Sequence, residues 1–157
     1  MKIVQPMLLF VAAAALAGPV SEDPPNHVAA GAKAGVAPGQ GHRWATDPAL
    51  RTGMGAIREA LSAGLPAIRA GTMRPDEYRA LSAAIGARVR TIIAECKLPP
   101  AADAELHPIL AALIVAANGM QGSQATASAA AAREAVSAVN RYGQIFEDPS
   151  WRPLELY

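Results

Sequence analysis

Hydrophobic residues recur at three- and four-residue steps in four separate stretches of this chain, as expected for amphipathic helices. The first stretch opens at Asp47-Pro48, where aspartate is a good N-cap and proline is accepted at the first helical position. Gly64 and Pro66 weaken its last turns, so the pattern predicts a helix that kinks or ends there, followed by a connection at Gly71 and Thr72. Its apolar stripe is Leu50, Met54, Ile57, Leu61, Leu65 and Ile68.

The second stretch has the most regular helical pattern in the chain. It opens at Arg74-Pro75-Asp76-Glu77, where a proline and two acidic residues favour a helix start. It ends at Leu98-Pro99-Pro100, because the residue before a proline avoids the helical conformation. The stripe consists of Tyr78, Leu81, Ile85, Val89, Ile92 and Cys96.

The third and fourth stretches complete the set. The third helix is predicted from Ala102 or Asp103 to Asn118, with Pro108 early enough to be tolerated or to bend the start. Its buried side is predicted to be Leu106, Ile109, Leu110, Leu113, Ile114 and Ala117. The fourth helix follows a loop at Gln121-Gly122-Ser123 and ends at Asp148-Pro149. Its stripe is Ala129, Ala132, Val136, Val139, Tyr142 and Phe146.

Short connections between amphipathic helices favour antiparallel neighbours. The sequence therefore predicts an all-α fold, an antiparallel up-down-up-down four-helix bundle over residues 44–157. A low aromatic content of 4% agrees with close-packed helices rather than a sheet. The main alternative is a three-helix bundle with a loosely attached fourth helix.

The residues before the bundle predict export. Residues 1–17 have a basic end at Lys2, an apolar run over Met7 to Leu16 and a small-x-small cleavage pattern at Ala15-Leu16-Ala17, so they are interpreted as a signal peptide. An uncleaved membrane anchor is the alternative, although the run is short for a bilayer. The predicted location is the periplasm, with no stable membrane insertion after cleavage. Residues 18–43 are predicted to be a flexible leader, rich in proline and glycine.

The charge balance and the cysteine content limit the kinds of partner and covalent link that the chain can have. The chain has 14 basic and 13 acidic residues, so its composition does not call for nucleic acid as a partner. The single cysteine, Cys96, excludes an intramolecular disulfide and leaves a buried thiol, a metal ligand or a crosslink between two chains. The oligomeric state stays open.

The predicted topology gathers several chemically distinctive residues at one end of the bundle. Met54, Cys96 and His107 lie there and form a candidate soft-metal site for Cu(I), since thioether, thiol and imidazole are ligands that this ion accepts. By helical count His107 lies at the boundary between the buried and the exposed faces. The alternative is that Met54 fills the core, Cys96 is a small hydrophobe and His107 is a surface residue. Tyr142, Phe146, Trp44 and Trp151 then form a hydrophobic plug over that end.

An exported bundle with a methionine early in its first helix resembles the periplasmic cytochrome b562 and cytochrome c-prime group. The resemblance covers roughly residues 47 to 147, and Met54 matches the haem-ligating methionine by position. It implies a haem and electron transfer. The fourth helix has Arg141 and Tyr142 where that group has a histidine, and no Cys-x-x-Cys-His motif is present. The segment from Tyr142 to Leu154 also resembles the tails of small proteobacterial exported proteins.

No nucleophile-base-acid pattern is visible, and all three histidines lie in the leader or at one helix start. The expected function is therefore non-enzymatic, a binding or interaction module with a periplasmic protein partner. Arginines on the solvated faces could receive acidic groups of such a partner: Arg58, Arg69, Arg79, Arg88 and Arg90. The alternatives are copper binding through Met54, Cys96 and His107, and a b562-like haem protein.

Overall fold

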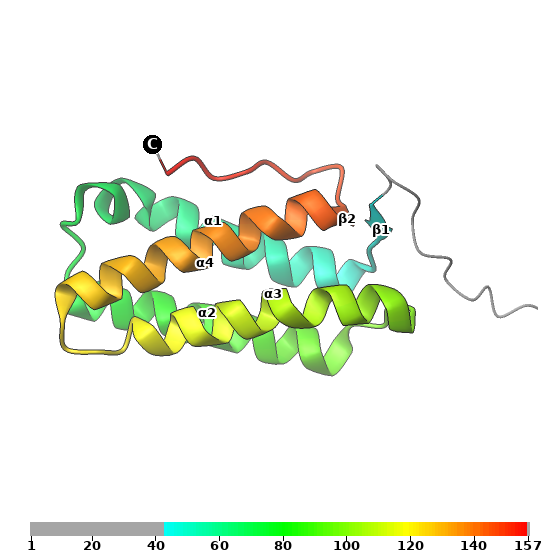
Figure 1. Ribbon diagram of the computed structural model, residues 1–157, viewed down its shortest axis with the longest axis horizontal. Coiled ribbons are helices and arrows are strands. Elements are labelled where there is room, and N and C mark those ends of the chain that lie inside the picture. Colours follow the sequence, from blue (N-terminus) through cyan, green and yellow to red (C-terminus); the bar gives the residue numbers. More distant parts are fainter. Residues whose placement is uncertain (1–42, 157) are drawn as a thin grey trace, which may run out of the picture. The chain divides into compact units, whose positions relative to one another are not determined.

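The computed structural model describes residues 43–156, and these form an all-α four-helix bundle, as predicted (Figure 1). The elements are β1 (Trp44–Ala45), α1 (Pro48–Ala70), α2 (Pro75–Glu95), α3 (Pro100–Gly119), α4 (Ala125–Ile145) and β2 (Phe146–Glu147). The predicted signal peptide, 1–17, and the predicted leader up to residue 42 lie outside the described residues.

Local sequence signals explain both ends of α1. The Asp47 carboxylate accepts a hydrogen bond from the Leu50 N–H at 2.6 Å, so Asp47 is the N-cap that the sequence predicts. Gly71 ends the helix with φ of 67°, a left-handed conformation that glycine adopts without a steric penalty. Of the two outcomes predicted at Gly64 and Pro66, a kink or an end, the end does not occur, since α1 continues to Ala70. Ile68 is fully buried, and its packing holds the last turn in place.

Prolines mark the starts of α2 and α3. In α2 the Glu77 carboxylate accepts a hydrogen bond from the Arg74 N–H at 2.7 Å, which joins the first turn to the residue before it. Pro100 is the first residue of α3, two residues earlier than the first predicted start. A proline is accepted there because the first helical N–H has no partner within the helix. Pro108 lies inside α3 without ending it.

Close helix contacts define the ends of the bundle. Gly53 near the start of α1 lies against Ile92 near the end of α2, and Gly119 at the end of α3 lies against Ala131 near the start of α4. The buried hydroxyl of Ser82 in α2 donates a hydrogen bond to the Ala117 carbonyl of α3 at 2.6 Å. Since α4 packs against α1 and α3, the alternative of a loose fourth helix does not apply.

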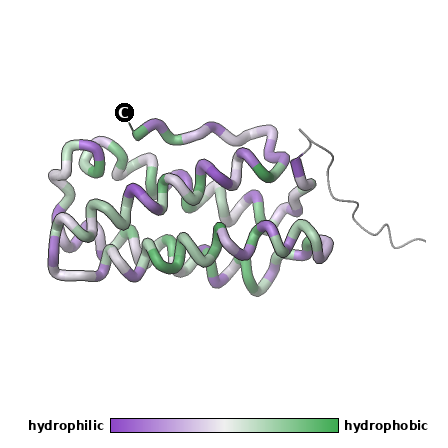
Figure 2. The backbone as a smooth tube through the Cα atoms, in the orientation of Figure 1, coloured by the Kyte–Doolittle hydropathy of each residue, from purple (hydrophilic) through white to green (hydrophobic). Residues whose placement is uncertain are grey.

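The core consists of aliphatic residues and alanines from all four helices, with Tyr78, Tyr142 and Phe146 as its largest fully buried side chains. One predicted core position is wrong, because Ile114 is 41% exposed. It lies on α3 close to two further exposed apolar residues, Ile93 at 63% and Val115 at 71%. Between Pro108 and Gly119, α3 has no charged residue, and Figure 2 shows much of this stretch in hydrophobic colours. Neighbouring helices do not cover all of its apolar side chains, since Ile114 and Val115 are exposed.

Within the described residues, α3 is also the one helix long and apolar enough to cross a membrane by length and composition. Buried helices of soluble proteins pass the same test, but only 39% of the apolar window of α3 is buried. The rest of that window faces outward from the bundle.

The chain ends in an extended segment that the helical pattern does not predict. Phe146 lies in β2 and pairs in parallel with Trp44 of β1, so its predicted place on the stripe of the fourth helix is wrong, although its side chain is fully buried. Residues 148–156, named here the C-terminal strap, then run back along α1 and α4 (Figure 1). Arg69 of α1 donates a hydrogen bond to the Glu155 carbonyl at 2.9 Å, and Arg58 donates to the Arg152 carbonyl.

Candidate functional site: a groove between two helices

An open groove of about 510 Å³ lies between α2 and α3. This volume falls within the range of small-molecule and peptide pockets. Aliphatic side chains form most of its wall, and polar side chains lie toward the loop that joins the two helices. The aliphatic residues are Ile92, Ile93, Leu98, Leu106, Leu110, Ala111 and Ile114. The polar or ionisable residues are Cys96, Lys97, Asp103 and His107.

Cys96 lies at the C-terminal end of α2, where its backbone N–H caps the helix by donating to the Ile92 carbonyl. Burial raises the pKa of the thiol to about 12, and the nearby carboxylates of Asp47 and Asp103 add to the effect. The thiol is therefore protonated at neutral pH. A protonated thiol is a weak nucleophile and must lose its proton before it ligates a metal ion.

Asp47 connects this end of the groove to α1. Besides the Leu50 N–H, its carboxylate accepts a hydrogen bond from the Lys97 N–H, just after the end of α2. Partial burial alone would raise the pKa of Asp47. The hydrogen bonds from the backbone N–H groups of Lys97 and Leu50 stabilise the carboxylate more than burial destabilises it, so the pKa is lowered. One carboxylate thus links the start of α1 to the end of α2.

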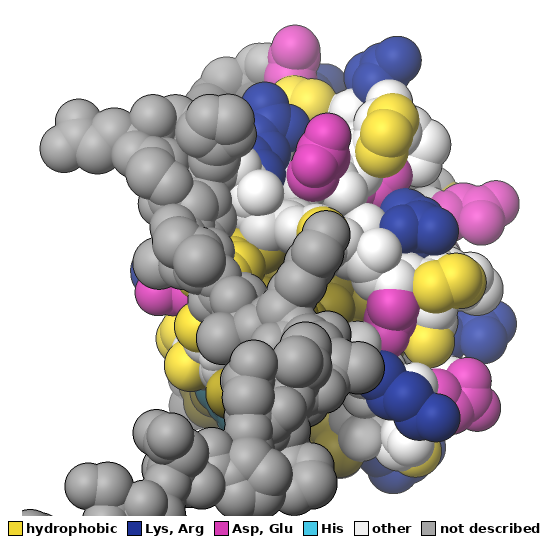
Figure 3. Space-filling model, turned by 90° about the vertical axis from the view of Figure 1, so that its right-hand side faces the viewer, with side chains coloured by type: hydrophobic (Ala, Val, Ile, Leu, Met, Phe, Trp, Pro, Cys, Tyr) yellow, Lys and Arg dark blue, Asp and Glu magenta, His cyan; other side chains and the backbone are white. Residues whose placement is uncertain are grey.

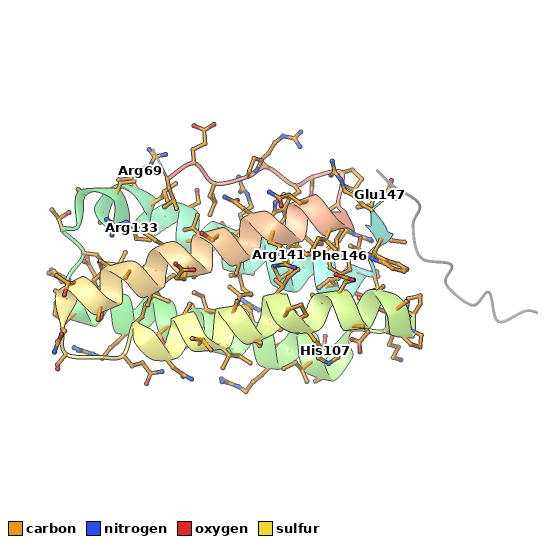
Figure 4. The ribbon with its side chains drawn as sticks, viewed as in Figure 1. Arg69, His107, Arg133, Arg141, Phe146 and Glu147 are labelled. Carbon is orange, nitrogen blue, oxygen red and sulfur yellow. The ribbon has the colours of Figure 1, made fainter. Side chains whose placement is uncertain are left out.

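His107 remains on the surface. Its side chain is 71% exposed, and Nδ1 lies 3.6 Å from a carboxylate oxygen of Asp103, one turn earlier in α3. In Figure 4 it lies on the side of α3 away from Arg141 and Phe146. The predicted boundary residue therefore lines the rim of the groove and does not enter the core.

Met54 is fully buried in the core and does not line the groove. Its neighbour Gly53 contacts Ile92, so Met54 lies at the same end of the bundle as Cys96. The structure thus brings two of the three predicted metal ligands, Cys96 and His107, to one groove. Within residues 43–156, no group of three or more His, Cys, Asp or Glu side chains is placed to hold a metal ion.

The residues that the haem resemblance singles out lie in packed surroundings. Tyr142 is fully buried, and its ring lies 5.3 Å from that of Phe146 and 4.6 Å from that of Trp151. Its hydroxyl donates to the buried Asp148 at 3.3 Å, and burial raises the pKa of Tyr142. Met54 and Tyr142, the residues at the positions of the two haem ligands, are thus both fully buried side chains of the core.

A second cavity, of about 370 Å³, lies where the strap leaves α4. It is lined by Arg43, Asn140, Gly143, Gln144, Trp151 and Pro153. Sequence reasoning placed Trp151 at this end of the bundle but not the strap, because residues 148–156 have no periodic pattern. It also missed that Arg58 and Arg69 donate hydrogen bonds to carbonyls of the strap.

Part of the end of the bundle near β1 and β2 is visible in Figure 3, and it shows no single dominant charge. Over the part of this face that is visible in Figure 3, acidic and basic side chains alternate with isolated hydrophobic ones. The visible part of this surface therefore has neither a basic patch that would suit nucleic acid nor an acidic patch that would suit a cationic partner.

Comparison of the chain with known protein families, with curated proteins and with solved structures found no match. The resemblance to the cytochrome b562 and c-prime group therefore rests on the sequence features alone. What the structure shares with that group is the packing of four helices.

Proposed function

We propose that this protein is an exported, non-enzymatic binding module that holds an apolar part of its partner in the groove between α2 and α3. The observation that supports the proposal most directly is the exposure of large aliphatic side chains at the groove. Ile93 and Ile114 line it and are 63% and 41% exposed. Grouped apolar residues on a protein surface are typical of interaction sites.

The polar residues of the groove support binding rather than catalysis. The Cys96 thiol has a raised pKa, and His107 lies beside Asp103 with no hydroxyl or thiol hydrogen-bonded to it among the described residues. Groups poised for catalysis have their pKa shifted toward the working pH, whereas that of Cys96 is shifted away from it. Export is proposed from the signal-like residues 1–17, and a periplasmic protein with an apolar segment is the expected partner.

A fluorescent apolar probe tests the groove without requiring the natural partner. N-phenyl-1-naphthylamine should gain fluorescence with the wild-type protein, and Ile114→Asp should weaken its binding about tenfold or more, since a carboxylate is costly against an apolar ligand. Ala130→Asp, at an exposed position of α4, is the matched control and should bind the probe like the wild type. An equal loss of probe binding in both variants would contradict the proposal that the groove is the binding site.

Export has its own test. Cell fractionation followed by N-terminal sequencing should find a periplasmic chain that begins at Gly18. A chain that begins at Met1 in the membrane fraction would instead support the uncleaved anchor.

Copper binding is the second candidate, because Cys96 and His107 line the same groove. Titration with Cu(I) should show tight binding by the wild-type protein. The double variant Cys96→Ala, His107→Ala should lose this binding. Met54→Leu tests the third ligand, since leucine preserves the core volume and removes the thioether. Unchanged affinity in the double variant would exclude the site.

A further inference from the structure

The groove has an apolar ridge beside it on the same helix. Ile114 lines the groove, and Val115, the next residue of α3, is 71% exposed. Ile93 lies on the α2 side of the groove and is 63% exposed. We name this side of the bundle the α2–α3 face and define it by Ile93, Ile114, Val115 and the groove. The face therefore has both an apolar ridge and an apolar hollow.

The charges on this face are of both signs. Lys97 and Asp103 both line the groove, and Lys97 has no ion pair among the described residues. Across the whole of α3 there is no lysine or arginine, whereas Asp103 and Glu105 lie in its N-terminal turns. The apolar helix α3 itself therefore offers no basic residue to anionic lipid or to a nucleic acid.

A surface that has a ridge, a hollow and one charge of each sign complements a second copy of itself. In a two-fold dimer, every contact between a residue of one copy and a residue of the other occurs twice, once on each side of the axis. The ridge of each copy can therefore enter the groove of the other, and the cation of each copy can lie opposite the anion of the other. A partner with a single sign of charge would match only one of Lys97 and Asp103.

We infer that two copies of this chain associate through their α2–α3 faces. The ridge at Ile114 and Val115 of each copy packs into the groove of the other, and Lys97 of each copy lies opposite Asp103 of the other. This inference rests on the proposed function, in which the groove is a binding surface, and it names the occupant of that surface.

Sedimentation equilibrium of the processed chain, recovered from the periplasm of a bacterial host, tests the dimer. The wild type should show a reversible monomer–dimer equilibrium. Val115→Asp should raise the dissociation constant about tenfold or more, because it places a carboxylate in the apolar contact. Since Val115 is mostly exposed, its substitution leaves the monomer folded. Ala130→Asp on α4 is the control and should dimerise like the wild type.

Charge reversal then tests the identity of the partner. Lys97→Glu and Asp103→Lys should each weaken self-association, because each places like charges opposite one another in a homodimer. When the two variants are mixed, both contacts pair opposite charges, so heterodimers should form with a dissociation constant near that of the wild type. Circular dichroism of each variant checks that the helices remain intact.

The outcomes separate this inference from the proposed function. A wild-type chain that stays monomeric at all accessible concentrations, or a dimer that Val115→Asp leaves unchanged, overturns the dimer. If that monomer still binds the apolar probe in a manner sensitive to Ile114→Asp, the binding module stands and its occupant is another molecule. If neither association nor probe binding is found, both proposals fail.

Discussion

The indole ring of Trp151 lies directly against the backbone of Gly143. A Cβ atom added at Gly143 would clash with Cδ1 and Nε1 of that ring, so no side chain fits between them. The same ring packs edge-on against Tyr142, the residue before Gly143. The strap therefore docks on α4 at a position where the helix has no side chain.

Gly143→Ala should destabilise the protein by about 1–3 kcal/mol, because the new methyl group displaces the indole from a packed contact. Urea unfolding followed by circular dichroism measures the change. Gly55→Ala in α1 is the matched control, since no atom lies within 4 Å of the added Cβ. It should stabilise the helix by up to about 1 kcal/mol. Equal stabilisation by both substitutions would show that the strap does not dock as described.

Asn140 holds the end of the strap with both groups of its side chain. Its Nδ2 donates to the Leu154 carbonyl at 2.7 Å, and its Oδ1 accepts from the Leu154 N–H at 2.8 Å. Asn140→Ala should reduce stability by about 1–3 kcal/mol and speed hydrogen exchange at the Leu154 amide. Asn118→Ala, at an exposed position of α3, should change neither quantity. Exchange at Leu154 that is already fast in the wild type would contradict a docked strap.

Acid should weaken the cap that Asp47 forms. Because the pKa of Asp47 is lowered in the folded protein, its carboxylate stabilises the fold above the ordinary value of 3.8. That contribution is lost as the pH falls through the lower folded value. The difference in unfolding free energy between wild type and Asp47→Asn should be constant near neutral pH and shrink in acid. Urea unfolding at a series of pH values measures it.

Two comparisons separate the charge of Asp47 from its role as a cap. Asp47→Ala should cost about 0.5–2 kcal/mol at neutral pH, as for other N-caps. Glu134→Gln removes an exposed carboxylate of α4 and should change stability little. If the difference in unfolding free energy between the wild type and Asp47→Asn grows in acid, the stated direction of the pKa shift is wrong.

Cys96 should react slowly with alkylating reagents at neutral pH, because burial and two nearby carboxylates raise its pKa to about 12. The rate with iodoacetamide should rise roughly tenfold per pH unit into the alkaline range, since only the thiolate reacts. Asp47→Asn should speed the reaction by removing one of the negative charges. A rate that levels off near pH 9, the ordinary value for a thiol, would contradict the buried environment.

The starts of α1 and α2 were predictable because their signals are local. Asp47-Pro48 and Arg74-Pro75 act through one side-chain hydrogen bond and one restricted dihedral angle, both within a few residues. Ile114 was assigned to the core by the same periodicity, and this prediction was wrong. Periodicity gives the face on which a residue lies, but not whether a neighbouring helix covers it.

The candidate site was predictable in part. Cys96 and His107 were expected at one end of the bundle, and they line one groove there. Met54 was expected beside them as a ligand, but its helical position also suits a core residue, and in the structure its side chain is fully buried. The choice between the two depends on rotamers and on the packing of neighbouring helices, which the spacing of residues does not contain.

By itself, the amino-acid sequence determined the four helices, most of their ends and most of their buried stripes, since these depend on neighbours within one or two turns. Only the tertiary structure decided that Phe146 leaves the helix to pair with Trp44, and that the strap returns over α1 and α4. The strap is held by hydrogen bonds from arginine side chains to its backbone carbonyls, and by the contact of the Trp151 ring with Gly143, where the helix has no side chain. Backbone groups are the same in every residue, so only the folded chain shows which of them meet.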